Sequence, residues 1–292
     1  MSFSSDIKQE LNKNNKLANK KLVKYELIGY LISGNIDMLE RNMVRFSTGS
    51  DYNINRFSKL LTNLDINHKI DILGKNFSIT FKATKVEDFV DINAKKIRIK
   101  EEIKYDKNEE ELKAIIIGVF MGSGSVNNPE KKYHLEIDFK EEVNLREVKK
   151  ILENFGIEVK TMNTENKKSL YLKDGEDISK LLALIGANKA VMQFEDIRIQ
   201  KEMRGKVNRL VNCKSANLNK TINASIEQIA AIKKLKDSGK FSRLSDNLKE
   251  IAELRVENPD MSLLELGKKL SEPVGKSGVN YRLKKIMEIA NE

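Results

Sequence analysis

The sequence is poor in the residues that form cross-links and metal centres. It contains one cysteine, Cys213, and two histidines, His68 and His134, among 292 residues. A single cysteine excludes an intrachain disulfide and suits a reducing compartment. One cysteine with two distant histidines also falls short of the four ligands of a structural zinc site. We therefore expect no metal and no cofactor, a structural role for His134 and a buried position for Cys213.

Long apolar runs and nucleotide-binding loops are missing as well. No run approaches the roughly 20 apolar residues of a membrane span, and the opening MSFSSDIKQELNK has no apolar core of a secretion signal. No glycine-rich loop ends in Lys-Ser or Lys-Thr, and the run Gly122–Ser125 follows an apolar helix, which makes it a turn. These absences predict a soluble, cytoplasmic protein with no membrane partner, and they favour a binding protein over an enzyme.

Basic residues outnumber acidic ones. The chain has 53 lysines and arginines against 43 aspartates and glutamates, a formal net charge of +10. A balance of this sign favours an anionic partner, although a lysine-rich composition alone does not identify one. Hydrophobic residues make up 40% of the chain, which is enough for buried cores. The length suits two domains, or three if a small one is counted.

Residues 241–292 are predicted to form a helix-turn-helix domain of three short helices. Apolar spacing predicts helices at 244–257 and 263–270, and a third that contains Val279 and Ala290. The link between the second and third helices is longer than the tight turn of about 3–4 residues in the simplest motif. The alternative is a generic helical domain with a solvated charged face.

Local signals support the first two of these helices. Pro259 ends the first, because the residue before a proline avoids the helical region. Ser262 followed by Glu265 predicts a capping box at the start of the second helix. Gly267 is expected to let a neighbouring helix approach closely.

The third helix is predicted to present a polar, basic face to DNA. Val279, Leu283 and Ile286 are spaced to pack inward, which turns the polar residues outward. Serine and asparagine suit base edges, whereas lysine, arginine and the tyrosine hydroxyl suit phosphate. The residues predicted to bind double-stranded DNA are Ser262, Lys276, Ser277, Asn280, Tyr281, Arg282, Lys284 and Lys285.

Residues 25–190 contain an internal repeat, with copies at about 25–85 and 112–190. Each copy begins with an apolar helix that has a glycine at the same place, LIGYLI in the first and IIGVFM in the second. Strand-like segments, a second helix and further strands follow in both. A glycine costs a helix roughly 1 kcal/mol relative to alanine, so Gly29 and Gly118 predict close helix–helix packing about a pseudo-twofold axis. The expected fold is α+β, a duplicated saddle followed by a small all-α domain.

The two apolar helices, LIGYLISGN and IIGVFMGSG, resemble the signature helices of LAGLIDADG homing endonucleases. The resemblance implies paired sheets that form a saddle over DNA. The endonucleases place a metal-binding carboxylate at the eighth motif position, which falls here on Gly34 and Ser123. The nearest acids, Asp37 and Glu130, do not match each other's place in the repeats. We expect a degenerate LAGLIDADG-like domain without catalytic residues or a metal site.

Longer motifs resemble the WhiA family from end to end. They are FSSDIKQEL, GVFMGSGSVNNPEKKYHLEI, RGKVNRLVNCKSANLNKT, AELRVENPDMSLLELGKKL and KSGVNYRLKKI. The resemblance implies a bacterial, sequence-specific transcription regulator tied to cell division, chromosome segregation or sporulation. Its expected location is the nucleoid, with the transcription machinery as a possible protein partner. Two alternatives stay open, a scaffold that binds a protein through the degenerate saddle and a residual metal-dependent nuclease.

Two further segments flank the repeat. Residues 1–24 are expected to form an N-terminal helical arm, and residues 191–240 a basic helical connector. From Glu195 to Lys240, eleven basic residues face five acids. The functional interpretation is an auxiliary basic strip that contacts phosphate, and the alternative is a solvated helix. The strip consists of Arg198, Lys201, Arg204 and Arg209.

Overall fold

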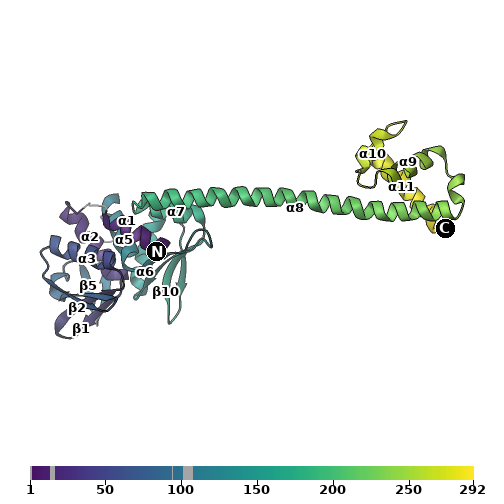
Figure 1. Ribbon diagram of the computed structural model, residues 1–292. Coiled ribbons are helices and arrows are strands. Elements are labelled where there is room, and N and C mark those ends of the chain that lie inside the picture. Colours follow the sequence, from purple (N-terminus) through teal and green to yellow (C-terminus); the bar gives the residue numbers. More distant parts are fainter. Residues whose placement is uncertain (1, 14–16, 94, 101–107) are drawn as a thin grey trace. The chain divides into compact units, whose positions relative to one another are not determined.

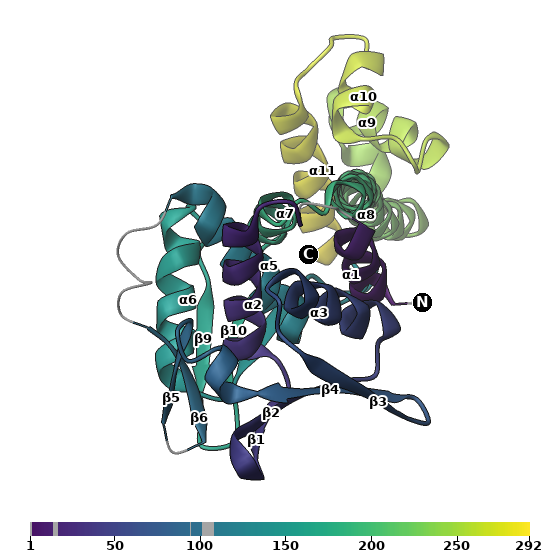
Figure 2. The same ribbon diagram turned by 90° about the vertical axis from the view of Figure 1, so that its left-hand side faces the viewer.

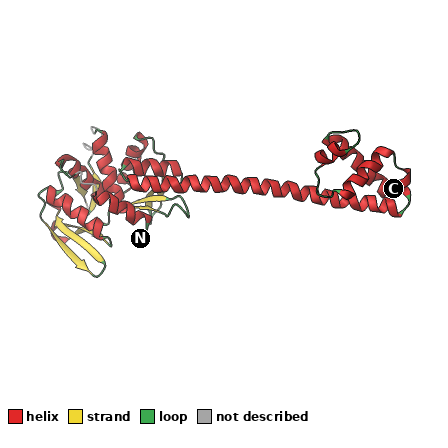
Figure 3. Cartoon of the chain, turned by 45° about the horizontal axis from the view of Figure 1, so that its top comes forward, coloured by secondary structure: helices red, strands yellow, loops and turns green. Residues whose placement is uncertain are grey.

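The computed structural model describes residues 2–13, 17–93, 95–100 and 108–292. They form two compact units, Met1–Lys201 and Glu202–Glu292 (Figure 1). Within the described ranges, strands occur only in the first unit, and the second unit is helical (Figure 3). The predicted class, α+β followed by a small all-α domain, is confirmed. None of the described helices is both long and apolar enough to cross a membrane.

The first unit consists of two copies of one sheet topology. The strand orders are β1-β2-β4-β3 and β7-β8-β10-β9, so in each copy the third and fourth strands exchange places in the same way. The elements of the first copy are α2 (Lys20–Ser33), β1 (Ile36–Leu39), β2 (Met43–Thr48), α3 (Asp51–Asn63), β3 (His68–Leu73) and β4 (Asn76–Lys82). Those of the second are α5 (Glu109–Ser123), β7 (Gly124–Val126), β8 (Leu135–Phe139), α6 (Glu142–Asn154), β9 (Lys160–Asn163), β10 (Lys168–Leu172) and α7 (Gly175–Leu184).

Helices α2 and α5 pack against each other through their glycines, as predicted. A Cβ atom on Gly29 would lie 2.2 Å from the carbonyl oxygen of Ile115, and one on Gly118 would lie 1.9 Å from that of Glu26. Only glycine permits such an approach of two helix backbones. Toward the C-terminal ends of the helices, the Ser33 hydroxyl donates to the carbonyl of Val119 over 3.1 Å.

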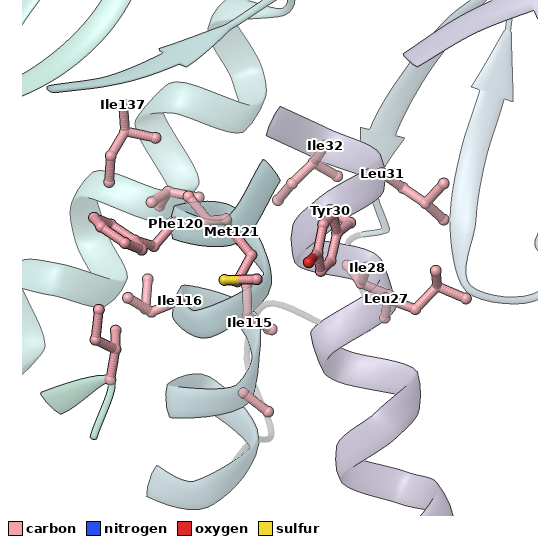
Figure 4. Close-up of a cluster of buried hydrophobic side chains, with 14 of the residues drawn as sticks. Leu27, Ile28, Tyr30, Leu31, Ile32, Ile115, Ile116, Phe120, Met121 and Ile137 are labelled. Carbon is pink, nitrogen blue, oxygen red and sulfur yellow. The ribbon is translucent and has the colours of Figure 1, made fainter. Parts of the chain in front are cut away.

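A buried core surrounds this helix pair. Figure 4 shows apolar side chains of α2 and α5, among them Leu27 and Ile116. The helices α3 and α6 pack on the sheets of the first and second copies (Figure 2). A buried polar chain joins three helices, because the Tyr30 hydroxyl donates to Asn53 Oδ1 over 2.7 Å and Asn53 Nδ2 donates to the carbonyl of Met121 over 2.9 Å.

Three further pieces complete the first unit. Helix α1 (Phe3–Lys13) belongs to its core, since Phe3 stacks on Phe194 with ring centroids 6.4 Å apart. The hairpin of β5 (Val90–Asn93) and β6 (Lys96–Ile99), which periodicity did not predict, is held by Asn144, whose Nδ2 donates to the carbonyl of Ile97 over 2.9 Å. Short 3-10 helices occupy Glu40–Asn42 (η1) and Ala83–Lys85 (η2).

The second unit is built from the end of one long helix and three short ones. These are α8 (Asn188–Asp237), of which residues 202–237 lie in this unit, then α9 (Asp246–Glu257), α10 (Leu263–Lys269) and α11 (Lys276–Asn291), with a 3-10 helix, η3, at Lys240–Arg243. Ile232 and Leu235 of α8 share one apolar cluster with Leu248, Leu266 and Ile286. The helix-turn-helix domain was expected to start at residue 241. The core of this unit begins earlier in the chain, with Ile232 and Leu235.

Candidate nucleic-acid interface

Helix α10 starts with the predicted capping box. The Glu265 N–H donates to Ser262 Oγ over 3.3 Å, and the Ser262 N–H donates to Glu265 Oε2 over 2.9 Å. The Ser262 hydroxyl also donates to the same carboxylate over 2.7 Å. These hydrogen bonds lower the pKa of the Glu265 carboxyl. The hydroxyl predicted to bind DNA is thus already engaged within the helix cap.

The link between α10 and α11 folds back onto Gly267. A Cβ atom there would lie 2.1 Å from the carbonyl oxygen of Val274, whose N–H donates to the carbonyl of Gly267 over 3.1 Å. The nearest neighbour of Gly267 is therefore the backbone of the link, and the expected neighbouring helix also approaches, since Val279 Cγ2 of α11 would lie 3.0 Å from the same Cβ atom. The beginning of the link is attached to α9, since the Ser271 N–H donates to Glu250 Oε1 over 2.6 Å.

A buried arginine, which sequence reasoning missed, holds the loop between α9 and α10. Arg255 is 1% exposed, and its Nη1 donates to the carbonyls of Asn258, Pro259 and Met261 over 3.5, 3.3 and 2.8 Å. Burial lowers the pKa of its guanidinium. Because this loop leads directly into the capping box, Arg255 positions the start of α10.

Helix α11 has the two faces that its periodicity predicted. Val279, Leu283, Ile286 and Ala290 are buried in the apolar cluster of the unit. The side chain of Tyr281 is 66% exposed. Of the other residues predicted to bind DNA on this helix, Arg282 is half-buried and the exposed ones are Lys276, Ser277, Asn280, Lys284 and Lys285.

The exposed face of α11 is positive over its first turns. From Lys276 to Lys285 the helix has four basic residues and no acid. Its N-cap is Gly275, which provides no side-chain hydrogen bond to the first turn. Backbone N–H groups at such a helix end, together with the helix dipole, attract anions such as phosphate. This face can bind the DNA backbone and present Ser277 and Asn280 to base edges, and those contacts stay a prediction.

The predicted auxiliary basic strip divides between the two units. In the first unit, Arg198 donates to Glu195 Oε1 over 2.7 Å, and the Lys201 ammonium lies 4.8 Å from the ring centroid of Tyr133. In the second unit, Arg204 and Arg209 are exposed. The Lys201 contact thus joins α8 to another part of the first unit, whereas the Arg198 pair lies within α8, and a role in phosphate binding stays a prediction for all four residues.

The positions that correspond to nuclease carboxylates have other structural uses. Gly34 caps α2, and a Cβ atom there would lie 2.8 Å from the carbonyl oxygen of Tyr30 and 3.2 Å from the Phe46 ring. The Ser123 hydroxyl donates to the carbonyl of Asp138 over 2.7 Å. Asp37 is paired with Lys140 over 2.8 Å. Glu130 is exposed in a turn outside the strands. No cluster of three or more potential metal ligands occurs in the described parts of the chain.

The outer face of the second sheet carries a charged network. Glu136 accepts hydrogen bonds from Lys167 over 2.7 Å and from Ser169 over 2.8 Å. Burial favours a higher pKa for Glu136, but these hydrogen bonds and the charge of Lys167 outweigh it and lower the pKa. Burial raises the pKa of the nearby Asp138 carboxyl. Lys167 lies 2.7 Å from Glu136 and 3.9 Å from Asp138, so this network mixes charges of both signs, unlike the face of α11.

The histidines have structural surroundings, whereas the expectation for cysteine is wrong. His68 lies between the Ser58 hydroxyl, 2.8 Å from its Nε2, and the carbonyl of Ile66, 2.9 Å from its Nδ1. His134 Nε2 lies 3.7 Å from Glu136 Oε2, and its Nδ1 is buried without a hydrogen-bond partner among the described residues, so its expected satisfied state is not seen. Cys213 is exposed on α8 rather than buried, like every residue of that helix from 206 to 220.

Comparisons with known proteins agree with both units. Residues 112–204 match the model of the WhiA LAGLIDADG-like domain, and residues 207–290 match the model of the WhiA C-terminal HTH domain. The Probable cell division protein WhiA of Clostridium perfringens is 49% identical over 63% of this chain. The corresponding protein of Clostridium tetani is 44% identical over 72%. The matched segments span 58% and 65% of the lengths of these two relatives.

Solved structures extend the likeness to the whole chain. Full-length WhiA from Thermotoga maritima superposes with a TM-score of 0.61 at 29% identity, covering 100% of this chain and 98% of that one. The separate N-terminal LAGLIDADG domain of WhiA gives a TM-score of 0.52 at 25% identity, over 63% of this chain and 90% of that one. Sequence motifs, the duplicated sheet topology and both family matches lead to one conclusion: the chain belongs to the WhiA family.

Proposed function

We propose that the protein is a sequence-specific DNA-binding regulator that reads double-stranded DNA with α11. The observation that carries the proposal is the exposed face of this helix, with four basic residues and no acid from Lys276 to Lys285. A basic stripe confined to a reading helix is the electrostatic signature of DNA binding.

The two ends of this face have different tasks in the proposed complex. Ser277 and Asn280 lie in the first turns, the part of a recognition helix that reaches base edges. An asparagine amide can donate to and accept from adenine at once, which gives it direct readout. Lys284 and Lys285 lie further along the helix and neutralise phosphates. The capping box at Ser262 fixes the direction of α10, against which α11 packs.

The test is a binding titration of the full chain on a target selected from random or genomic DNA. Asn280→Ala and Tyr281→Ala are expected to weaken specific binding by about 1–3 kcal/mol and to relax the sequence preference. Asn247→Ala is the matched control, since Asn247 is exposed on α9 and away from the face. If the Asn280 and Tyr281 variants bind the target as tightly and as selectively as the Asn247 variant, α11 does not read DNA.

The proposed biological role is regulation of genes for cell division, chromosome segregation or sporulation, at the nucleoid. The support is the family, whose relatives in Clostridium are named as cell division proteins. Contact with the transcription machinery is part of this proposal. Mapping of binding sites across the genome, with the Asn280→Ala variant as control, tests the role, because loss of the sites in the variant links them to α11.

A second candidate function concerns the first unit, which we propose acts as a protein-binding scaffold and not as a nuclease. Its second sheet carries the carboxylates Glu136 and Asp138 beside Lys167, a network of mixed charge that offers phosphate no basic stripe like that of α11. Position 34 has no room for a carboxylate, and Ser123 has none to offer. Purified protein is expected to leave plasmid DNA uncut in magnesium or manganese. The proposal would be refuted if the protein cuts plasmid DNA and the Asp37→Asn variant does not.

A further inference from the structure

Within the second unit, the exposed part of α8 carries an unusual number of apolar side chains. Met203, Val207, Leu210, Val211 and Leu218 are 63%, 58%, 57%, 53% and 53% exposed. Their spacing places them on one side of the helix, within an arc of about 100° at 3.6 residues per turn. We call these five residues the α8 stripe. A contiguous apolar patch of this kind marks an interaction surface.

The charges around the stripe are of one sign. From Met203 to Lys220 the sequence contains five basic residues and no acid. Helical geometry places Arg204 and Lys206 on the two flanks of the stripe and Lys214 within it. Lys206 reaches an acid only outside this segment, in an ion pair of 2.8 Å with Glu202. The other side of the helix is mostly polar, with Asn208, Asn212, Ser215 and Asn219 beside the basic Arg209 and Lys220.

The combination of apolar stripe and basic flanks selects one kind of occupant. A second copy of α8 would bring five basic residues against five more, and like charges across an interface oppose association. An interfacial membrane helix normally has aromatic anchors on its apolar face, and Met203–Lys220 contains no aromatic residue. DNA provides no apolar surface of this length. A helix with an apolar stripe and acidic flanks satisfies both the contact and the charge.

We propose that the α8 stripe is the docking site for an acidic amphipathic helix of a partner protein. The partner's apolar residues pack against Met203, Val207 and Leu210, and its carboxylates face Arg204 and Lys206. This site is separate from the DNA-reading face of α11, and the proposal does not depend on what α11 binds.

Two synthetic peptides of equal length test this docking on the full chain. Both have leucine at the core positions of a heptad repeat, and their remaining positions are mainly glutamate in one and lysine in the other. The acidic peptide is expected to bind saturably, with the lysine peptide as control. Leu210→Glu is expected to weaken binding about tenfold or more, because it buries a charge at the centre of the contact.

A matched variant separates docking from charge attraction. Asn212→Glu adds the same charge on the side of α8 opposite the stripe, and it is expected to change binding by about twofold at most, as for a screened surface charge. Both variants replace exposed residues, so equal far-UV circular dichroism and thermal transitions are expected. Equal weakening by the two variants overturns the proposal, since it means charge attraction without a defined site.

The other occupants give distinct results. Failure of the acidic peptide to bind, or equal binding of the lysine peptide, overturns the proposal. The full chain is also mixed with vesicles of phosphatidylglycerol and phosphatidylethanolamine. If it adsorbs to them and Leu210→Glu abolishes the adsorption, the stripe binds a membrane surface instead. If sedimentation equilibrium shows a dimer of the wild type and a monomer of the Leu210→Glu variant, the stripe binds a second copy of the chain.

Discussion

The contact between α2 and α5 leads to the sharpest stability prediction, for Gly118→Ala. The new methyl group would lie 1.9 Å from the carbonyl oxygen of Glu26, inside the roughly 3 Å that a carbon and an oxygen atom require. Because the obstacle is helix backbone, the two helices must separate by about 1 Å. Overpacking of this kind typically costs about 1–3 kcal/mol.

Separation of the helices also stretches the hydrogen bonds that α5 accepts from α2 and from α3, which packs on α2. One hydrogen bond runs from the Ser33 hydroxyl to the Val119 carbonyl over 3.1 Å, and another from the Asn53 amide to the Met121 carbonyl over 2.9 Å. Each contributes about 1 kcal/mol. Alanine returns about 1 kcal/mol through its helix propensity. The expected net loss is about 2–4 kcal/mol in the free energy of unfolding of the first unit.

The assay is urea unfolding followed by tyrosine fluorescence. Six of the seven tyrosines lie before residue 202, so this signal reports mainly on the first unit. Gly205→Ala is the control for the glycine-to-alanine change itself, because a Cβ atom there meets nothing closer than Arg209 Nη1 at 3.8 Å; as Gly205 lies in the second unit, the tyrosine-detected transition of the first unit is expected to stay unchanged. Its helix is expected to gain up to about 1 kcal/mol. A Gly118→Ala protein as stable as wild type would show that the helices do not need the glycine contact.

Three further predictions concern the second unit. Lys284→Ala and Lys285→Ala are expected to weaken binding to all DNA sequences alike and each to lower the salt dependence by about one unit, measured by titration at several salt concentrations. Arg255→Met is expected to destabilise the unit by about 2–4 kcal/mol, measured by thermal unfolding, because three loop carbonyls lose their donor. The pKa of the Glu265 carboxyl is lowered in the folded protein. Its ionised form therefore stabilises the fold when the pH is above the ordinary carboxyl pKa of 4.5, and this contribution is lost as the pH falls through the folded pKa. Glu265→Gln is expected to remove that part of the acid dependence of unfolding.

Features that repeat or act locally were open to prediction from the sequence. The glycines at 29 and 118 occupy the same place in two copies, and their cost within a helix indicates a reason for their presence. The capping box needs only Ser262 and Glu265, three residues apart. The inward face of α11 follows from the spacing of Val279 and Leu283. Each of these inferences depends on short-range geometry.

Features that depend on tertiary neighbours were not open to prediction. Arg255 lies in a helix with acidic neighbours and resembles a solvated charge, because its partners are three backbone carbonyls without a side-chain signature. The approach of a helix to Gly267 was expected and Val279 of α11 makes it, but the closer approach of the Val274 backbone was not, since the link has no periodicity. Cys213 was expected to be buried because cysteine usually is, but the middle of α8 offers no core to bury it in.

The packing around Gly34 connects the end of α2 to the aromatic core of the first copy. The Phe46 ring that faces Gly34 also stacks on Phe57, with centroids 4.4 Å apart, and meets Tyr30 edge-on at 5.6 Å. A side chain at position 34 would therefore press on a ring that has two aromatic partners and cannot move alone. The helix end and the three rings form one mechanical unit, so a change in the size of residue 34 is transmitted into the core.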